Sequence, residues 1–249
     1  MRIIGICGHD FCGSTLLSRL FAAIPSVASG GELRWLLTDP NKRGRCCICG
    51  DSCNVFTKSM KKGITEKNLY KRVGNAFKKE ILVSSDKGYK QYERYVKYGT
   101  MTGIVLFRSI EGIASSDKKH QKIWPYTRRK TVKSSLRNWM KIYRKLLKWA
   151  PVFCSDYVIL SYETLVSDYA RVMTALCERL EIPMNGTFPS GSLVDNYHNI
   201  LGNPSAHNSR EVRQDDSWKK RLTKKEIDYI HCHTRAQRLY NKLRKRSFV

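Results

Sequence analysis

A glycine-containing turn between an apolar run and an amphipathic segment carries the clearest chemical signal in the sequence. Gly8 and Gly13 have four residues between them, and Ser14-Thr15 follow directly. This is nearly the nucleotide P-loop, G-x-x-x-x-G-K-[ST], with Ser14 in place of the lysine that contacts the terminal phosphates of ATP. The N–H groups of such a turn and the start of the next helix bind anions, usually phosphate. The turn therefore indicates either a phosphate site without ordinary ATP or GTP hydrolysis, or only a tight strand-to-helix connection.

Two charged residues occupy positions from which they could contact a ligand. Glu32 follows Gly30-Gly31, and glycines let a carboxylate approach a bound molecule closely because they carry no side chain. Glu32 is therefore a candidate general base, although a glutamate that starts a helix is, taken alone, the simpler explanation. Arg108 directly follows the apolar run GIVLF. The carboxyl ends of parallel strands are where such sheets bind ligands.

Four cysteines lie close together, at Cys46, Cys47, Cys49 and Cys53. Such a cluster is typical of a zinc site or of a local disulfide. Because no histidine is near in the sequence, we expect no metal and interpret the segment as a small loop with reactive or paired thiols. The other cysteines are scattered singly, which is typical of a reduced intracellular protein.

The composition is strongly basic, with 46 Lys and Arg against 21 Asp and Glu, a net charge of +25. Such an excess attracts anions, among them nucleic acid, acidic glycans, nucleotides and anionic lipid. Basic and aromatic residues alternate over 117–133, which fits either single-stranded nucleic acid, a sugar chain or a solvated loop. No apolar run approaches the roughly 20 residues of a membrane span, and we find no signal peptide. We therefore expect a soluble cytoplasmic protein.

Apolar runs that alternate with helical patterns predict an α/β protein with a parallel sheet. Strands are expected at 3–6, 27–29, 80–84, 103–107 and 157–162, and helices at 14–24, within 55–79, at 132–149, at 168–180 and after a capping box at Thr223-x-x-Glu226. We expect 117–133 and 186–213 to be loops. The length of 249 residues suits a single domain.

Several segments resemble, in chain order, the sulfotransferases that use 3′-phosphoadenosine 5′-phosphosulfate. The segments are Cys12-Gly13-Ser14-Thr15-Leu16-Leu17, Arg108 with Ser116, Ser161-Tyr162-Glu163-Thr164-Leu165, and Asp216-Ser217-Trp218-Lys219-Lys220-Arg221-Leu222-Thr223. They are similar to the family's 5′-phosphosulfate loop, its 3′-phosphate motif, its Y-E-D-L segment near the adenine and its late D-W-K…T segment. Ser29-Gly30-Gly31-Glu32 resembles the glycine–glutamate segment of the tyrosylprotein-sulfotransferase-like and bacterial branches, and in the former this glutamate is the base.

The resemblance implies a three-layer, P-loop-like fold with a central parallel sheet flanked by helices. Within one domain over 1–249, we expect lid or substrate insertions at 38–79 and 117–133 and a cofactor-covering loop at 186–222. The implied catalytic residues are Glu32 as base and Lys87, which would stabilise charge on the sulfonyl group or the leaving oxygen. The implied cofactor-binding residues are His9, Cys12, Gly13, Ser14, Thr15, Arg108, Ser116, Tyr162, Arg210, Arg213 and Trp218. No metal is required for this chemistry.

Two departures from the family pattern affect these expectations. Phe11 stands where the family has a basic residue, so a contact to the 5′-phosphate is missing unless His9 or Lys87 supplies it. The histidine base of the small-molecule branch has no counterpart near Ser85-Asp86-Lys87, and this favours Glu32.

The sequence leaves the acceptor open, whether a glycan, a peptide or a small molecule, and a basic surface suits an acidic one. Two other functions fit the same residues. The first is a P-loop kinase or nucleotide hydrolase. The second is a non-catalytic basic protein that binds nucleic acid or another polyanion.

Overall fold

The computed structural model describes residues 1–123, 131–189, 197–203, 207 and 211–249. Its centre is a five-stranded sheet in the order β2-β3-β1-β4-β5. The strands are β1 (Arg2–Gly8), β2 (Val27–Gly31), β3 (Ile81–Lys87), β4 (Met101–Phe107) and β5 (Asp156–Ser161). All four neighbouring pairs are parallel, and Gly5 of β1 is in register with Ser84 of β3 and Gly103 of β4. The parallel sheet predicted from the sequence is confirmed.

Side chains that alternate along the strands form two separate cores, one on each face of the sheet. In β1, Ile3 and Cys7 belong to one core, and Ile4 and Ile6 belong to the other. A parallel sheet must be covered on both faces, so its strands are apolar on both sides. This explains why the strands read as continuous apolar runs in the sequence.

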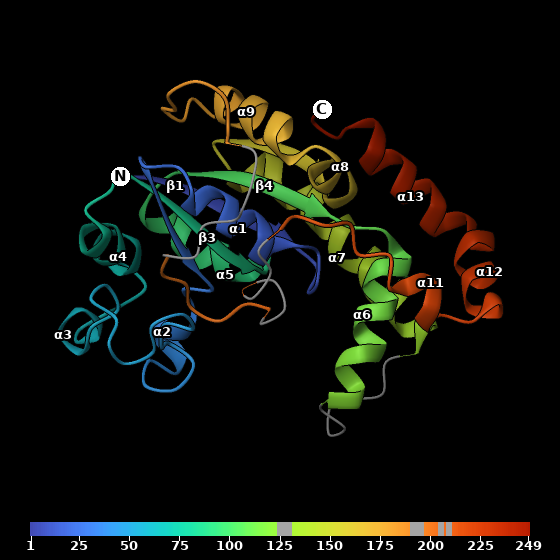
Figure 1. Ribbon diagram of the computed structural model, residues 1–249, viewed down its shortest axis with the longest axis horizontal. Coiled ribbons are helices and arrows are strands. Elements are labelled where there is room, and N and C mark those ends of the chain that lie inside the picture. Colours follow the sequence, from blue (N-terminus) through green and yellow to red (C-terminus); the bar gives the residue numbers. More distant parts are fainter. Residues whose placement is uncertain (124–130, 190–196, 204–206, 208–210) are drawn as a thin grey trace.

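Helices supply the outer layers of both cores (Figure 1). The core that contains Ile4 is completed by α1 (Ser14–Ala22), α8 (Tyr162–Ser167) and α9 (Tyr169–Arg179). The opposite core is completed by α4 (Leu69–Phe77), α5 (Tyr89–Tyr95), α6 (Ile110–Ile123), α7 (Val132–Phe153), α12 (Lys224–Cys232) and α13 (Thr234–Lys245). Shorter elements are α2 (Trp35–Thr38), α3 (Lys58–Lys61), the 3-10 helix η1 (Val96–Tyr98) and α11 (Trp218–Arg221). The three-layer arrangement agrees with the expected P-loop-like architecture.

One predicted loop is wrong in its first part, because α6 continues to Ile123. The polar side chains that made 117–123 look like a loop are held by neighbouring helices. Asp117 is buried and accepts a hydrogen bond of 2.6 Å from Ser135 Oγ of α7. Lys118 Nζ lies 2.9 Å from Glu226 Oε1 of α12. The rest of the expected loop includes 124–130, which lie outside the described residues.

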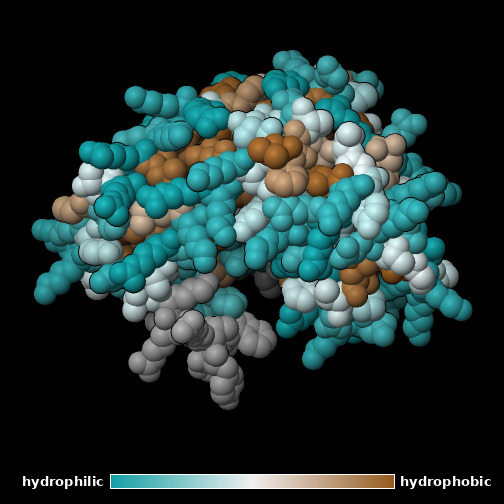
Figure 2. Space-filling model, turned by 180° about the vertical axis from the view of Figure 1, so that it is seen from behind, coloured by the Kyte–Doolittle hydropathy of each residue, from teal (hydrophilic) through white to brown (hydrophobic). Residues whose placement is uncertain are grey.

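Two groups of helices cover opposite ends of the sheet. Figure 1 shows α2, α3 and α4 at one end and α6, α11, α12 and α13 at the other, with the carboxyl ends of the strands between them. The predicted capping box is present, with Thr223 and Glu226 bonded reciprocally at the start of α12. Figure 2 shows that the reverse face is mostly hydrophilic, with apolar side chains in separate small areas. Among the described residues, no helix combines the length and apolar content that a membrane span requires.

Candidate active site

The turn after β1 has the geometry expected of an anion-binding loop. Gly13 adopts φ +99°, a left-handed conformation that favours glycine, and it caps the start of α1. A Cβ at this position would overlap the Tyr162 ring, so only glycine lets the ring lie against the turn. Ser14 and Thr15 are buried at the first turn of α1. The helix N-terminus and the turn thus point their N–H groups to the carboxyl edge of the sheet.

The other predicted residues of this turn make contacts within the protein. The His9 ring is buried, with Nδ1 2.7 Å from the Asp10 carbonyl and Nε2 2.9 Å from Asn138 Nδ2. Burial raises the pKa of the Cys12 thiol to about 11, so that thiol is neutral at pH 7. Thr15 Oγ1 accepts a 3.0 Å hydrogen bond from the Asn203 N–H. The segment 197–203 therefore packs directly against the start of α1.

Glu32 and Lys87, the two predicted catalytic residues, form one buried ion pair. Lys87 Nζ is 2.6 Å from Glu32 Oε1, and the exposed fractions of the two side chains are only 15% and 4%. Arg34 Nη2 donates to the other oxygen at 2.5 Å, and Trp35 Nε1 lies 3.2 Å from that oxygen. Glu32 directly follows β2 and Lys87 is the last residue of β3, so the ion pair lies at the carboxyl edge of the sheet.

The Lys87 ammonium also lies beside the anion-binding turn, 3.9 Å from Asp10 Oδ1. Burial alone would lower the pKa of Lys87, but the Glu32 and Asp10 carboxylates raise it above its ordinary value. The ammonium therefore stays charged at neutral pH. A fixed positive charge at this point can stabilise an anion that is bound by the turn.

Asp86, next to Lys87, accepts two hydrogen bonds that hold Arg34 in place. Its Oδ1 accepts the Arg34 backbone N–H at 2.9 Å, and its carbonyl accepts from Arg34 Nη1 at 2.5 Å. Complete burial raises the pKa of this carboxyl to about 6, although the hydrogen bonds from Arg34 act in the opposite direction. Arg34 and Asp86 were not predicted as site residues. Their closeness in the sequence to Glu32 and Lys87 was the signal that could have identified them.

The raised pKa of Asp86 predicts a pH-dependent stability that a single substitution removes. The folded state keeps the proton up to about pH 6, while the unfolded state releases it near the ordinary pKa of 3.8. This contribution to stability is therefore present at low pH and is lost as pH rises from about 4 to about 6, by up to about 3 kcal/mol. Asp86→Asn should flatten this part of the curve of unfolding free energy against pH, measured by urea denaturation. An unchanged curve in the variant would contradict the prediction.

Arg108 connects the middle of the chain to the opening turn. Its guanidinium is buried, Nη1 donates to the Phe11 carbonyl at 3.3 Å, and Cζ lies 4.5 Å from the centre of the Tyr162 ring. Because Tyr162 also lies against Gly13, the same ring contacts both the guanidinium and the turn. The two phosphate-binding elements predicted from distant parts of the sequence are therefore adjacent.

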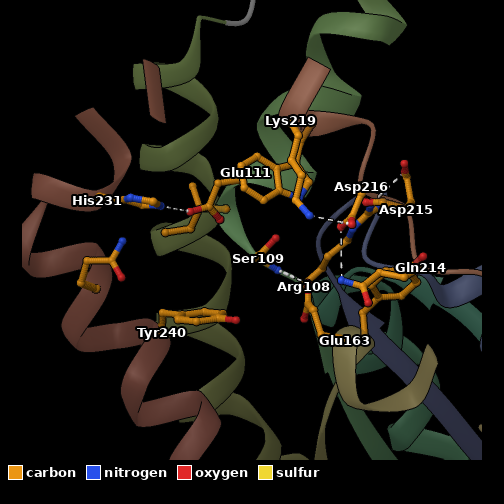
Figure 3. Close-up of a pocket in the computed structure, with 14 residues that line it drawn as sticks. Arg108, Ser109, Glu111, Glu163, Gln214, Asp215, Asp216, Lys219, His231 and Tyr240 are labelled. Carbon is orange, nitrogen blue, oxygen red and sulfur yellow. Dashed lines mark hydrogen bonds and ion pairs between the residues drawn. The ribbon is translucent and has the colours of Figure 1, made fainter. Parts of the chain in front are cut away.

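A cavity of about 350 Å³ opens in front of Arg108 and Tyr162 (Figure 3). Its other walls come from α6, from 214–216 and from helices α11, α12 and α13. Both Asp215 and Arg108 line this cavity, and Asp215 Oδ2 lies 2.9 Å from Arg108 Nη2. Partial burial alone would raise the pKa of Asp215, but hydrogen bonds from Ser217 and Arg108 lower it to about 2. A carboxylate therefore occupies the position in which Arg108 would grip a ligand anion.

Most of the remaining predicted residues, among them Gly13, Ser14, Thr15, Ser116 and Arg213, do not line this cavity. Trp218 lines it. Ser116 lies two turns along α6, where its hydroxyl donates to the Gly112 carbonyl at 2.9 Å. Arg213 is exposed and pairs with Glu211 at 2.6 Å. Arg210 lies outside the described residues. Two residues that line the cavity, Asp215 and Glu163, were not predicted from the sequence. Glu163 Oε1 accepts a 2.9 Å hydrogen bond from the Ser109 N–H at the cavity wall.

The cysteine loop lies beside the Glu32 end of the site, and its interpretation needs correction. All nine cysteines fall within the described residues, and each is free, so the structure contains no thiol pair. No histidine is near this loop in the sequence, but the fold brings His198 Nδ1 to 3.2 Å from Cys49 Sγ. The spacing Cys46-x-x-Cys49 was the sequence signal that could have found this cluster.

Comparison with solved structures shows which known fold the chain shares. No protein-family model and no curated protein matches the sequence. The sulfotransferase domain from the curacin biosynthetic pathway matches with a TM-score of 0.66 at 17% identity, covering 97% of both chains. The sulfotransferase domain of the Synechococcus PCC 7002 olefin synthase matches with a TM-score of 0.59 at 16% identity over 94% of each chain. Mouse sulfotransferase SULT7A1, solved with PAP, gives 0.52 at 12% identity, covering 98% of this chain and 89% of its own.

Proposed function

We propose that this chain, which has the fold of the sulfotransferases, transfers a sulfonyl group from 3′-phosphoadenosine 5′-phosphosulfate to a hydroxyl or amine of an acceptor. The donor supplies the sulfonyl group when bound. The acceptor classes to test are glycans, peptides and small molecules, with acidic ones first because of the net charge of +25.

One observation carries the proposal: the Arg108 guanidinium lies directly beside the turn that holds Gly13. Arg108 donates to the Phe11 carbonyl of the turn and stacks on Tyr162, which itself lies against Gly13. A doubly phosphorylated adenosine needs two anion sites, whereas ATP needs one continuous site with a lysine after Gly13. The Asp215 carboxylate pairs with Arg108 at 2.9 Å, so a bound 3′-phosphate would take the place of that carboxylate.

Each residue then has a role that follows from its contacts. The N–H groups of Gly13, Ser14 and Thr15 would hold the 5′-phosphate, and Arg108 would hold the 3′-phosphate in the forked geometry that suits guanidinium. Lys87 keeps a positive charge where negative charge develops during transfer. Glu32, held between Lys87 and Arg34, would accept the acceptor's proton through its carboxylate.

A binding comparison tests the proposal and separates it from the two other functions. Adenosine 3′,5′-bisphosphate should bind more tightly than ATP in titration calorimetry, and a screen of acceptors with the sulfonyl donor should then yield a sulfated product. Tighter binding of ATP would instead support a kinase or hydrolase. No binding of either nucleotide, together with oligonucleotide affinity that falls steeply with salt, would support a polyanion-binding protein.

Removing the carboxylate that faces Arg108 should improve nucleotide binding. In Asp215→Asn the guanidinium no longer has a competing anion, and a partly exposed ion pair contributes up to about 1 kcal/mol. We therefore expect the Kd for adenosine 3′,5′-bisphosphate to fall by up to about fivefold. Asp51→Asn is the matched control, because Asp51 pairs with Arg45 at 2.7 Å and does not line the cavity. Weaker binding by the Asp215 variant would contradict a competitive role.

A further inference from the structure

Four potential metal ligands converge beside the Glu32 end of the site, although they come from two distant segments. Cys46, Cys49 and Cys53 belong to the loop between α2 and α3, and His198 belongs to the segment 197–203. Cys49 Sγ is 3.3 Å from Cys46 Sγ and 3.2 Å from His198 Nδ1. Cys53 Sγ is 3.4 Å from the same nitrogen, and all four atoms lie within 4.8 Å of one another.

These distances match the edges of a metal-sized tetrahedron. With Zn–S about 2.3 Å and Zn–N about 2.0 Å, tetrahedral coordination separates neighbouring ligand atoms by about 3.5 to 3.8 Å. Three thiols and one imidazole nitrogen are a common structural zinc set, and Cys46-x-x-Cys49 has the spacing of such sites. We propose that Cys46, Cys49, Cys53 and His198 bind one structural zinc ion.

The local backbone suits a charged thiolate cluster. Gly50 follows Cys49 with φ +58°, and its N–H donates to the Cys46 carbonyl at 3.1 Å, which closes a tight turn around the first two ligands. The Phe56 N–H lies 3.2 Å from Cys53 Sγ, and such donors stabilise sulfur in its anionic form. The Phe77 ring contacts the His198 ring edge to face at 6.0 Å between centroids. Cys46 and Cys53 are buried, so the ion would be shielded from water.

The four ligands fill the coordination sphere, so the role is structural rather than catalytic. The hydrogen bonds around the zinc site indicate which segments the ion would hold together. The Cys47 N–H donates to the Asn199 carbonyl at 2.8 Å, and the Ile200 carbonyl accepts the Glu32 N–H at 2.9 Å. Three residues further on, Asn203 donates to Thr15. The ion would therefore fasten the segment that contacts both the predicted base and the anion-binding turn. The zinc proposal does not depend on the sulfotransferase proposal.

Metal analysis of the full-length protein, purified without chelator, tests the site directly. We expect about one zinc per chain, and X-ray absorption should give about three sulfur ligands near 2.3 Å and one nitrogen near 2.0 Å. Prolonged treatment with a strong chelator should lower the Tm, and added zinc should restore it. Iron in place of zinc, no bound metal, or a Cys46–Cys49 disulfide found by mass spectrometry would each overturn the proposal.

Substitutions separate the ligands from their neighbours. Cys49→Ser and His198→Ala should each lose most of the zinc, whereas Cys47→Ser should retain it. Cys47 is the matched control because it sits between two ligands in the sequence but lies outside the cluster, with its Sγ 3.0 Å from the Asn199 carbonyl. Full zinc content in the ligand variants would overturn the assignment. If those variants do not fold, the zinc content and absorption spectrum of the unsubstituted protein still decide it.

Discussion

Glu32→Gln is expected to lower the rate of sulfonyl transfer by about 10²- to 10⁴-fold, the usual contribution of a positioned base. In the unsubstituted protein, Lys87 Nζ lies 2.6 Å from Glu32 Oε1. Glutamine keeps the shape of the side chain and can still accept a hydrogen bond from Lys87. It cannot take a proton at neutral pH. The measurement is single-turnover transfer to the acceptor found by the screen.

The affinity for adenosine 3′,5′-bisphosphate should change little in this variant, because Glu32 is not among the residues proposed to hold the phosphates. Glu66→Gln is a suitable control, since Glu66 is an exposed carboxylate paired with Arg94 at 3.3 Å. Equal turnover in the Glu32 variant and in the unsubstituted protein would remove Glu32 from the mechanism.

Arg108→Ala should weaken binding of adenosine 3′,5′-bisphosphate by about 10- to 100-fold. Hydrogen bonds to charged groups contribute about 1.5 to 3 kcal/mol each, and the guanidinium is the buried cation at the cavity. Arg108→Lys keeps the charge but loses the forked geometry, so its affinity should fall between the two. Titration calorimetry at fixed ionic strength measures these differences.

A second ligand separates the loss of a phosphate contact from general damage to the cavity. Adenosine 5′-monophosphate lacks the 3′-phosphate, so its affinity should be nearly the same with and without the Arg108 side chain. Arg171→Ala provides the matched protein control, because Arg171 is exposed, pairs with Asp168 at 3.2 Å and does not line the cavity. An equal loss of affinity for both nucleotides would show that Arg108 acts on the shape of the cavity rather than on the phosphate.

The parts of the site that follow strand ends could be predicted from the sequence. Gly13, Glu32, Lys87 and Arg108 each come within a few residues of an apolar run, and a parallel sheet gathers such positions at one edge. The sheet itself was predictable for the same reason, since apolar runs alternate with helical patterns. Local spacing was sufficient because each strand carries its own polar residue to the site.

Contacts between segments that are distant in the sequence could not be predicted in this way. Asp215 reaches Arg108 from 107 positions along the chain, and His198 reaches Cys53 from 145. Neither residue lies in a periodic pattern, and only the path of the loops between elements decides where each one ends. The same reason explains why 117–123 was predicted as a loop: the partners that hold Asp117 and Lys118 in a helix, Ser135 and Glu226, lie on other helices.

The hydrogen bond from Arg108 to the Phe11 carbonyl fixes the distance between the two elements that we propose to bind phosphate. If both elements bind phosphate, selection among nucleotides depends on the separation of the two phosphates as well as on their charge. An isomer whose second phosphate sits on the 2′-oxygen carries the same charge but presents it at a different separation from the 5′-phosphate. Such a compound would have to break this bond or leave one phosphate unheld.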